Sequence, residues 1–289
     1  MSDSAAAAAL LDPSPRVRRL RQAWAAADGA LRPVVDIARP YVTGLDNLPA
    51  DGRFLLVGNH TAASFAEVFL IPHYVRRAIG GEVRMLADRA FGMHRGPAAD
   101  LIAAYGGVVG SPESVRELMD HDETILVFPG GGQEIAKFKG EEYVLRWKQR
   151  EGFAREAVAR DYPIVPVGLV GGDDVYQSLT TRDSMWGRLI QAAHRALPGG
   201  PPDMAMPLVR GVGPTLIPRP QRMYLAFGEP ISTTRPARTA VAKWVTSVRN
   251  ETKASLERLL DDLLTVRGDD PYRELNPLAW HRAVQPQDG

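Results

Sequence analysis

Near its middle the chain reads Thr124-Ile125-Leu126-Val127-Phe128-Pro129-Gly130-Gly131-Gly132-Gln133-Glu134, and further upstream it reads Phe54-Leu55-Leu56-Val57-Gly58-Asn59-His60-Thr61. In both stretches a short apolar run stops abruptly at small and polar residues. Such runs are typical of buried parallel strands that enter loops. Because ligands bind at the carboxyl ends of the strands in open α/β sheets, both loops are expected at the binding edge of such a sheet.

The two loops offer different chemistry. His60 is the residue type best suited to proton transfer near neutral pH. The glycines Gly130 to Gly132 lack side-chain bulk, so a substrate can approach their backbone N–H groups, which are possible donors to an oxyanion or a phosphate. Taken alone, each feature has a plainer explanation: a histidine after a strand is more often a cap, and three glycines are only a turn signal.

A histidine base usually has a partner that fixes its tautomer, and three side chains are candidates here. Glu67 would be too far from His60 for direct contact if residues 61–79 were helical throughout, so this pairing requires that the first of those residues form a loop. Ser64 is nearer in the sequence, and Glu134 could reach His60 from the glycine loop.

The rest of the chain predicts a mainly parallel central sheet with crossover helices, because strand and helix patterns alternate along it. The expected strands are 53–58, 83–87, 106–109, 123–128, 163–169 and 223–227. The expected helices are 63–79, 97–104, 112–120, 141–160, 184–196 and 237–265, the last of them amphipathic. Asp173 and Asp174 are expected to cap the start of a helix rather than to bind a metal.

We expect four parts along the chain. Residues 1–15 have the composition of a disordered tail, and residues 16–40 that of an amphipathic helical segment whose arginines lie opposite an apolar face with Trp24. Residues 41–235 are expected to form the α/β domain, and residues 236–289 a C-terminal helix and tail that pack on it.

Composition excludes several classes of protein. The 289 residues are 45% hydrophobic, enough for one enzyme-sized core. The absence of cysteine excludes disulfides, thiolate zinc sites and a catalytic thiol. A net charge of +1 gives no global sign of nucleic-acid binding. No run approaches the ~20 apolar residues of a membrane span, and the beginning of the chain makes a poor signal peptide.

These segments resemble the glycerolipid acyltransferases, a superfamily that contains lysophospholipid acyltransferases and the monoacylglycerol and diacylglycerol acyltransferases. The resemblance runs from about Phe54 to Glu229. Within it, 128–134 matches the FPGG-x-x-E of the neutral-lipid branch, whereas the lysophospholipid branch would carry a glutamate where Gly130 stands. The superfamily's usual first motif, H-x4-D, is incomplete, because Phe65 occupies the place of the aspartate.

The resemblance implies a fold like that of the glycerol-phosphate acyltransferases and a histidine base at His60, with Glu67 and Glu134 as further candidate catalytic residues. The candidate substrate-binding residues are Asn59, Ser64, Arg95, Ser111, Phe128, Pro129, Gly130, Gly131, Gly132, Lys137 and Lys139. The two lysines could bind the phosphates of coenzyme A, although solvated charges on a helix face explain them equally well. The second-motif region, 106–114, has no basic residue, which suits a neutral acceptor.

We therefore expect an O-acyltransferase that moves a fatty acyl group from acyl-CoA or acyl carrier protein to a lipid hydroxyl, with no cofactor and no metal. The expected acceptor is a neutral glycerolipid or a long-chain alcohol, with lysophosphatidate as the alternative. The basic N-terminal segment predicts a peripheral location on the cytoplasmic face of a membrane, and no nucleic-acid partner is expected. Two other classes stay open: a thioester or lipid hydrolase that uses water at the same base, and an inactive lipid-binding protein.

Overall fold

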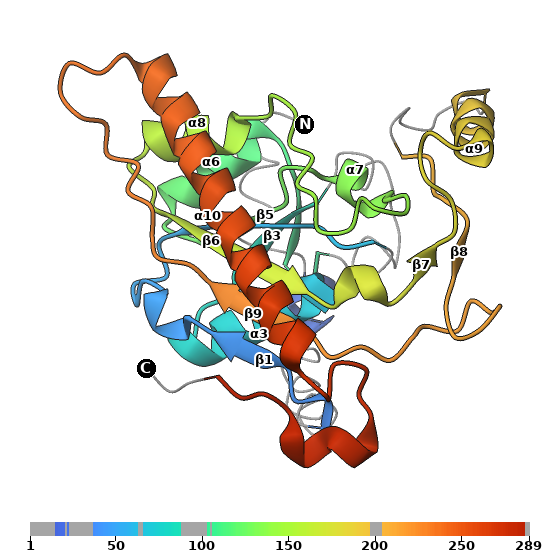
Figure 1. The fold of residues 1–289 in the computed structure, drawn as a ribbon. Coiled ribbons are helices and arrows are strands. Elements are labelled where there is room, and N and C mark those ends of the chain that lie inside the picture. The colour runs from blue at the N-terminus through green and yellow to red at the C-terminus, as the bar shows by residue number, and fades with distance from the viewer. Residues whose placement is uncertain are drawn as a thin grey trace.

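A seven-stranded sheet lies at the centre of the molecule (Figure 1). The computed structural model describes residues 15–20, 22, 37–62, 66–87, 103–104, 106–196 and 204–286. The sheet has the order β1-β9-β6-β2-β5-β3-β4. Its strands are β1 Tyr41–Thr43, β2 Leu55–Gly58, β3 Val83–Ala87, β4 Gly107–Val109, β5 Thr124–Val127, β6 Ile164–Val170 and β9 Tyr224–Phe227. A separate two-stranded sheet pairs β7 Gln177–Ser178 with β8 Val209–Arg210.

The described helices connect these strands or follow them. The α-helices are α3 Ala66–Ile79, α6 Pro112–Asp120, α7 Gly132–Ile135, α8 Gly152–Ala159, α9 Met185–Ala196 and α10 Val241–Asp269. Short 3-10 helices are η1 Leu45–Asn47, η2 Gly172–Asp174 and η3 Pro277–Arg282. Within the described ranges, no helix is both long enough and apolar enough to cross a bilayer.

The central sheet is mainly parallel, as the sequence predicts. Strands β6, β2, β5, β3 and β4 all run in the same direction. β9 pairs antiparallel with β6, and β1 pairs parallel with β9, so these two strands run against the other five. All six expected strands are present, and β1, β7 and β8 were not expected.

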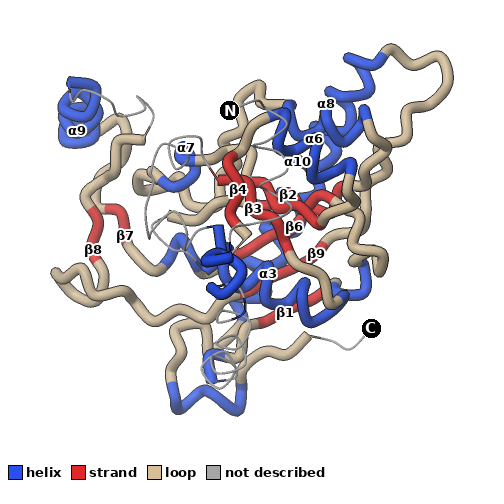
Figure 2. The backbone as a smooth tube through the Cα atoms, turned by 180° about the vertical axis from the view of Figure 1, so that it is seen from behind, coloured by secondary structure: helices blue, strands red, loops and turns tan. Residues whose placement is uncertain are grey.

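Helices cover both faces of the sheet because its strands are apolar on both faces. In β2, Leu55 and Val57 belong to the core on the side of α6, α8 and α10, while Leu56, and Phe54 just before the strand, belong to the core on the side of α3. This alternation follows from the two-residue period of a strand. α10 crosses the sheet in front in Figure 1, and α3 lies on the side seen in Figure 2.

The long C-terminal helix packs on β6 through one apolar stripe. Its buried positions are Val245, Val248, Thr252, Leu256, Leu260 and Leu263, spaced three or four residues apart as the amphipathic pattern requires. Gly168 of β6 faces this helix, and a Cβ on that glycine would lie 3.3 Å from the Cβ of Leu259. The glycine therefore allows the helix to lie close against the strand.

The expected helix 141–160 is wrong over its first half, because only α8 is helical there. The backbone amide of Tyr143 donates to Asp173, and that of Arg146 donates to Glu134. Tyr143 also has a φ of 60°, outside the right-handed helical region. The amides of this segment thus bind buried carboxylates instead of helix carbonyls.

Several expected segments lie mostly outside the described residues. They are the tail 1–15, the amphipathic segment 16–40 and the helix 97–104; residues 15–20 and 103–104 are helical. The other expected helices are present, with α6 matching its predicted bounds and α3 described over Ala66–Ile79.

Gly44 joins β1 to η1, and its lack of a side chain is required by β9. Its φ is 73°, and an added Cβ would lie 2.0 Å from the carbonyl oxygen of Phe227. Gly80 has a similar φ of 76° but open space around its Cβ position.

We expect Gly80→Ala to lower the free energy of unfolding by on the order of 1 kcal/mol, the left-handed backbone penalty. Gly44→Ala should lower it several times more, because its Cβ would also clash with Phe227. Urea unfolding measures both, and equal losses would contradict the steric explanation.

Candidate active site

The site forms where β2 and β5 end side by side. The two strands are parallel neighbours, with Leu55 opposite Ile125, so the loops that follow them leave the sheet at the same edge. The rings of His60 and Phe128 stack there, with centroids 4.7 Å apart. A Cβ on Gly58 would lie 3.1 Å from the Phe128 ring, so this glycine leaves room for the stack.

Glu67 binds the ring of His60 directly. The distance from His60 Nδ1 to Glu67 Oε1 is 2.5 Å. This contact is possible because residues 61 and 62 are not helical and Glu67 lies in the first turn of α3. The Glu67 carboxylate is fully buried and also accepts hydrogen bonds from the Thr61 backbone amide and hydroxyl. Thr61 was not predicted as a site residue.

This arrangement leaves the other ring nitrogen of His60 available. A carboxylate only accepts, so Nδ1 is the donor and the neutral ring carries its lone pair on Nε2. No part of the chain that the structure describes forms a hydrogen bond with Nε2, and 17% of the side chain is exposed. Nε2 is therefore the nitrogen that can take a proton from a bound substrate.

Glu134 holds the backbone of His60 rather than its ring. One carboxylate oxygen accepts from the His60 amide at 3.0 Å, and the other accepts from the Arg146 amide at 2.8 Å. Burial raises the pKa of Glu134, while these two hydrogen bonds oppose the rise. A Cβ on Gly130 would lie 2.1 Å from Glu134 Cδ, so the side chain of Glu134 fills the space that Gly130 leaves.

A buried ion pair holds the other side of the loop after β2. Lys137 Nζ donates to the Asp173 carboxylate at 2.6 Å and to the carbonyl oxygen of His60 at 2.9 Å. The second oxygen of Asp173 accepts from the Ala62 amide at 2.6 Å. Burial raises the pKa of Asp173 in spite of the nearby lysine.

Lys137 is almost fully buried, and its ammonium group is engaged by Asp173 and the carbonyl oxygen of His60. The expectation for Asp173 and Asp174 is wrong. Asp173 and Asp174 lie inside η2 rather than capping a helix, and the N-cap there is Gly171. Within the described residues there is no cluster of side chains that could hold a metal ion.

The glycine loop has a fixed backbone. Gly131 has a φ of 54°, and its amide donates to the Phe128 carbonyl at 2.9 Å. Arg150 Nη1 donates to the carbonyl oxygens of Pro129 and Gly130, each at 2.8 Å. Among the described residues, nothing accepts from the amides of Gly130 and Gly132. These two amides are the candidate donors to an oxyanion.

Three other expected substrate contacts have structural roles or remain exposed. Asn59 is buried and bonds the amide and carbonyl of Leu169, which ties the end of β2 to β6. Ser111 caps α6 by accepting from the Ser114 amide. Lys139 is exposed. Ser64 and Arg95 lie outside the described residues.

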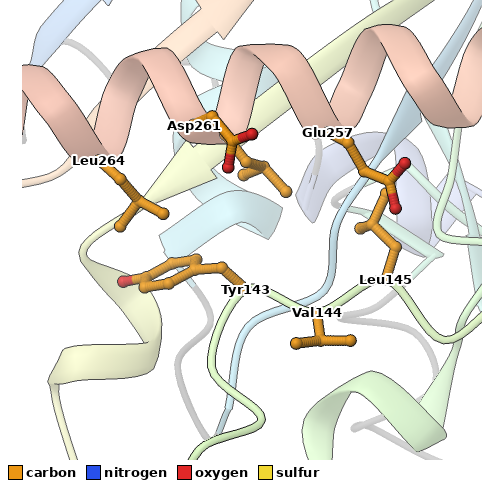
Figure 3. Close-up of a pocket in the computed structure, with 7 residues that line it drawn as sticks. Tyr143, Val144, Leu145, Glu257, Asp261 and Leu264 are labelled. Atoms are coloured by element: carbon orange, nitrogen blue, oxygen red, sulfur yellow. The ribbon is translucent and has the colours of Figure 1, made fainter.

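Tyr143 links the site to α10. Its hydroxyl donates to Asp174 at 2.5 Å and accepts from the Gly171 amide, and burial holds the pKa of this phenol well above its usual value. The ring also lines a surface pocket of about 360 Å³ with Val144, Leu145, Glu257, Leu260, Asp261 and Leu264 (Figure 3). Because the pocket excludes His60 and the glycine loop and bears two carboxylates, we do not assign it to an acyl chain.

The two amides bound by Glu134 predict the effect of removing its charge. In Glu134→Gln, the amide NH2 group replaces one accepting oxygen, so one of the two backbone donors loses its acceptor. We expect a loss of about 1–3 kcal/mol in the free energy of unfolding and a lower turnover. Glu142→Gln is the matched control, since Glu142 is exposed and accepts from one amide only, that of Gly140. Equal stability of both variants in urea unfolding would argue against this role.

Comparisons with known proteins find relatives that match most of this chain. Phytyl ester synthase 1 of Arabidopsis thaliana is 28% identical over 264 residues, which are 81% of this chain and 35% of the relative. Phytyl ester synthase 2 of the same plant is 28% identical over 260 residues, 84% of this chain and 36% of the relative. An uncharacterized protein of Mycobacterium tuberculosis is 30% identical over 205 residues, 70% of this chain and 54% of the relative.

The chain thus spans about a third of the length of the two plant relatives. The family profile described as diacylglycerol acyltransferase matches residues 78–262, which is more than half of the chain. The matched range begins after His60 and includes the glycine loop. On this match, the chain belongs to the diacylglycerol acyltransferase family.

Proposed function

We propose that this chain transfers a fatty acyl group from a thioester to the hydroxyl of a neutral lipid, with His60 as the general base. The observation that carries the proposal is the 2.5 Å contact between His60 Nδ1 and the buried Glu67, at the carboxyl edge of a parallel sheet. A histidine oriented in this way has its basic nitrogen free and its conjugate acid stabilised by a carboxylate.

The reaction follows from this geometry. His60 Nε2 takes the proton of the acceptor hydroxyl as the oxygen attacks the thioester carbonyl carbon. The carbonyl π electrons move to its oxygen, and the resulting oxyanion accepts hydrogen bonds from backbone amides, for which Gly130 and Gly132 are the candidates. Re-formation of the carbonyl breaks the C–S bond, and the leaving thiolate takes the proton from the imidazolium. The products are an ester and a free thiol.

The acyl donor is proposed to be acyl-CoA or acyl carrier protein. The buried Lys137 contributes to the position of His60, so donor phosphates would need other cations. Lys139 is exposed on the segment that follows the glycine loop and is the candidate that remains of the two lysines.

Two arginines near the second-motif region are engaged in ion pairs. Arg84 pairs with Glu123, and Arg116 pairs with Glu156 in a two-pronged contact. The acceptor is therefore proposed to be a neutral alcohol, such as an acylglycerol or a long-chain alcohol. The names of the two plant relatives, phytyl ester synthases, support an alcohol acceptor of this class.

A hydrolase would use the same base with water as the nucleophile. The distinction depends on what occupies the space beside His60 Nε2, and an assay can measure it directly. Release of thiol that requires the acceptor lipid supports transfer, and release that is independent of the acceptor supports hydrolysis.

His60→Ala should lower acyl transfer by at least ~100-fold, the low end of what a general base contributes. Glu67→Gln should lower it less, because the ring remains but loses a carboxylate partner. His121→Ala is a matched control, since His121 is exposed on the turn after α6. Thiol release is measured with and without acceptor, and thermal melting shows that each variant is folded. Near-normal turnover in His60→Ala would place the base elsewhere.

Competition between acceptors tests the neutral-lipid proposal. With equal amounts of lysophosphatidate, monoacylglycerol and a long-chain alcohol in one assay, we expect the two uncharged acceptors to be acylated in preference. The reason is the absence of a basic residue in 106–114 and the pairing of Arg84 and Arg116. A clear preference for lysophosphatidate would overturn the acceptor class and leave acyl transfer in place.

A further inference from the structure

The residues between η2 and β9 extend to one side of the central sheet. We use the name lateral arm for 176–196 and 204–219, which contain β7, α9 and β8. Figure 1 shows β7, β8 and α9 beside the main body rather than against either face of the sheet. The strands pair antiparallel, with Gln177 opposite Arg210.

α9 presents its apolar side to solvent. Met185, Trp186 and Leu189 are 76%, 60% and 56% exposed. Trp186, Leu189 and Ala193 are spaced three and four residues apart, so they share one side of the helix. A surface helix that packs on a core has the opposite orientation, with its apolar side buried.

Contacts within the lateral arm fix this orientation. Gly187 is buried, and a Cβ there would lie 2.1 Å from the carbonyl oxygen of Thr181, so only glycine allows this close approach. Gln191 Nε2 donates to the carbonyl oxygens of Arg182 and Gly187, at 2.9 and 3.1 Å. The side of α9 that contains Gly187 and Gln191 therefore faces the chain, while Trp186 and Leu189 face outward and the arginines Arg188 and Arg195 stay exposed.

Exposed apolar side chains continue along the rest of the lateral arm. Leu179 and Leu208 are neighbours across the β7–β8 pair, where the amide of the first donates to the carbonyl of the second at 2.8 Å. The further exposed apolar residues are Met206, Val212, Leu216 and Ile217. Exposed apolar surface concentrated in one part of a protein marks a site of interaction with another molecule or a membrane.

The charges of the lateral arm are almost all positive. Arg188, Arg195 and Arg210 form no ion pair with any residue in the described ranges. Asp183 is the one acidic residue among the described residues of the lateral arm. A surface of this composition is complementary to an anionic one.

We infer that the lateral arm docks on an anionic lipid surface. A helix with Trp and Leu on one side and arginines on the other is the composition of an interfacial amphipathic helix, which lies in the plane of the headgroups. Trp has its preferred place at that boundary, and arginines extend their aliphatic stems across apolar surface to reach lipid phosphates. Charge complementarity thus favours a membrane over a protein partner. The inference does not depend on the reaction, since docking needs no turnover.

The base of the lateral arm is attached to the active-site segment. Arg182 donates to Glu141 at 2.7 Å and stacks over Phe138, and the Lys139 amide donates to the Thr180 carbonyl at 3.0 Å. The same segment contains Lys137, which holds the carbonyl of His60. Docking of the lateral arm would therefore keep the site at a fixed position relative to the lipid surface.

Vesicle flotation of the purified full chain tests this inference. The probes are vesicles of phosphatidylcholine alone and of phosphatidylcholine with phosphatidylglycerol. The variants are Trp186→Ser with Leu189→Ser, and Arg188→Glu with Arg195→Glu. The matched control is Trp280→Ser with Leu278→Ser, a Trp and Leu pair exposed by 48% and 81% on η3. Thermal melting shows that each variant is folded.

We expect the wild-type chain to float with the anionic vesicles, and salt to weaken this binding. Either arm variant should lose about tenfold or more in affinity, while the control keeps the wild-type value. Failure of the wild type to bind either vesicle would overturn the inference and indicate a protein partner. Binding that survives both arm variants would also overturn it, and charge reversal of Arg16, Arg18, Arg19 and Arg21 would then test the N-terminal segment. Neither result bears on thiol release in the acyl-transfer assay.

Discussion

Each of the three consecutive backbone amides of residues 60–62 donates to a different buried carboxylate, and the geometry of the site depends on these three bonds. The His60 amide donates to Glu134, the Thr61 amide to Glu67 and the Ala62 amide to Asp173. They come from α7, α3 and η2, elements far apart in the sequence, so the loop takes its shape only when the sheet and its helices are assembled. Hydrogen bonds from amides to carboxylates are among the stronger ones in proteins. The ring of His60 is thereby oriented before a substrate arrives, which is the condition for efficient proton transfer.

This arrangement has a cost in stability. Burial raises the pKa of both Glu134 and Asp173, which means that the charged form of each is disfavoured in the folded protein. The positive charge of Lys137 offsets part of this cost at Asp173. The same ammonium group also donates to the carbonyl oxygen of His60 and so helps to hold that residue in place. Replacing such a buried pair with apolar residues is often neutral or stabilising in proteins. We interpret the pair as retained for the position it gives His60 rather than for its contribution to stability.

The sequence predicted the sheet well because strands have local sequence signals. It predicted the site only in part because the site depends on contacts between residues that are distant in sequence. Strands such as β2 and β5 are apolar runs bounded by glycine, a local signal, and the parallel arrangement follows from their alternation with helices. The contact between His60 and Glu67 required residues 61 and 62 to lie outside a helix, and helix ends are poorly determined by local sequence. The irregular segment 141–151 could not be predicted, because its amides bind carboxylates that are distant in sequence. The role of Lys137 was missed for the same reason: a lysine beside glutamates has the same local pattern whether it is solvated or buried against Asp173.

Gly130 and Glu134 of the glycine motif pack directly against each other. The position of a Cβ on Gly130 lies 2.1–2.3 Å from the Cγ, Cδ and Oε1 atoms of Glu134, so the two positions cannot both carry side chains in this conformation. A glutamate at position 130, as in the lysophospholipid branch that the sequence only partly resembles, would enter the volume that Glu134 fills here. In this chain the carboxylate comes from α7, and its two oxygens are both occupied by amides, those of His60 and Arg146. A carboxylate that is fully buried and bound in this way holds the backbone of the proposed base, His60. The spacing of the motif therefore reflects how the loop after β2 is held.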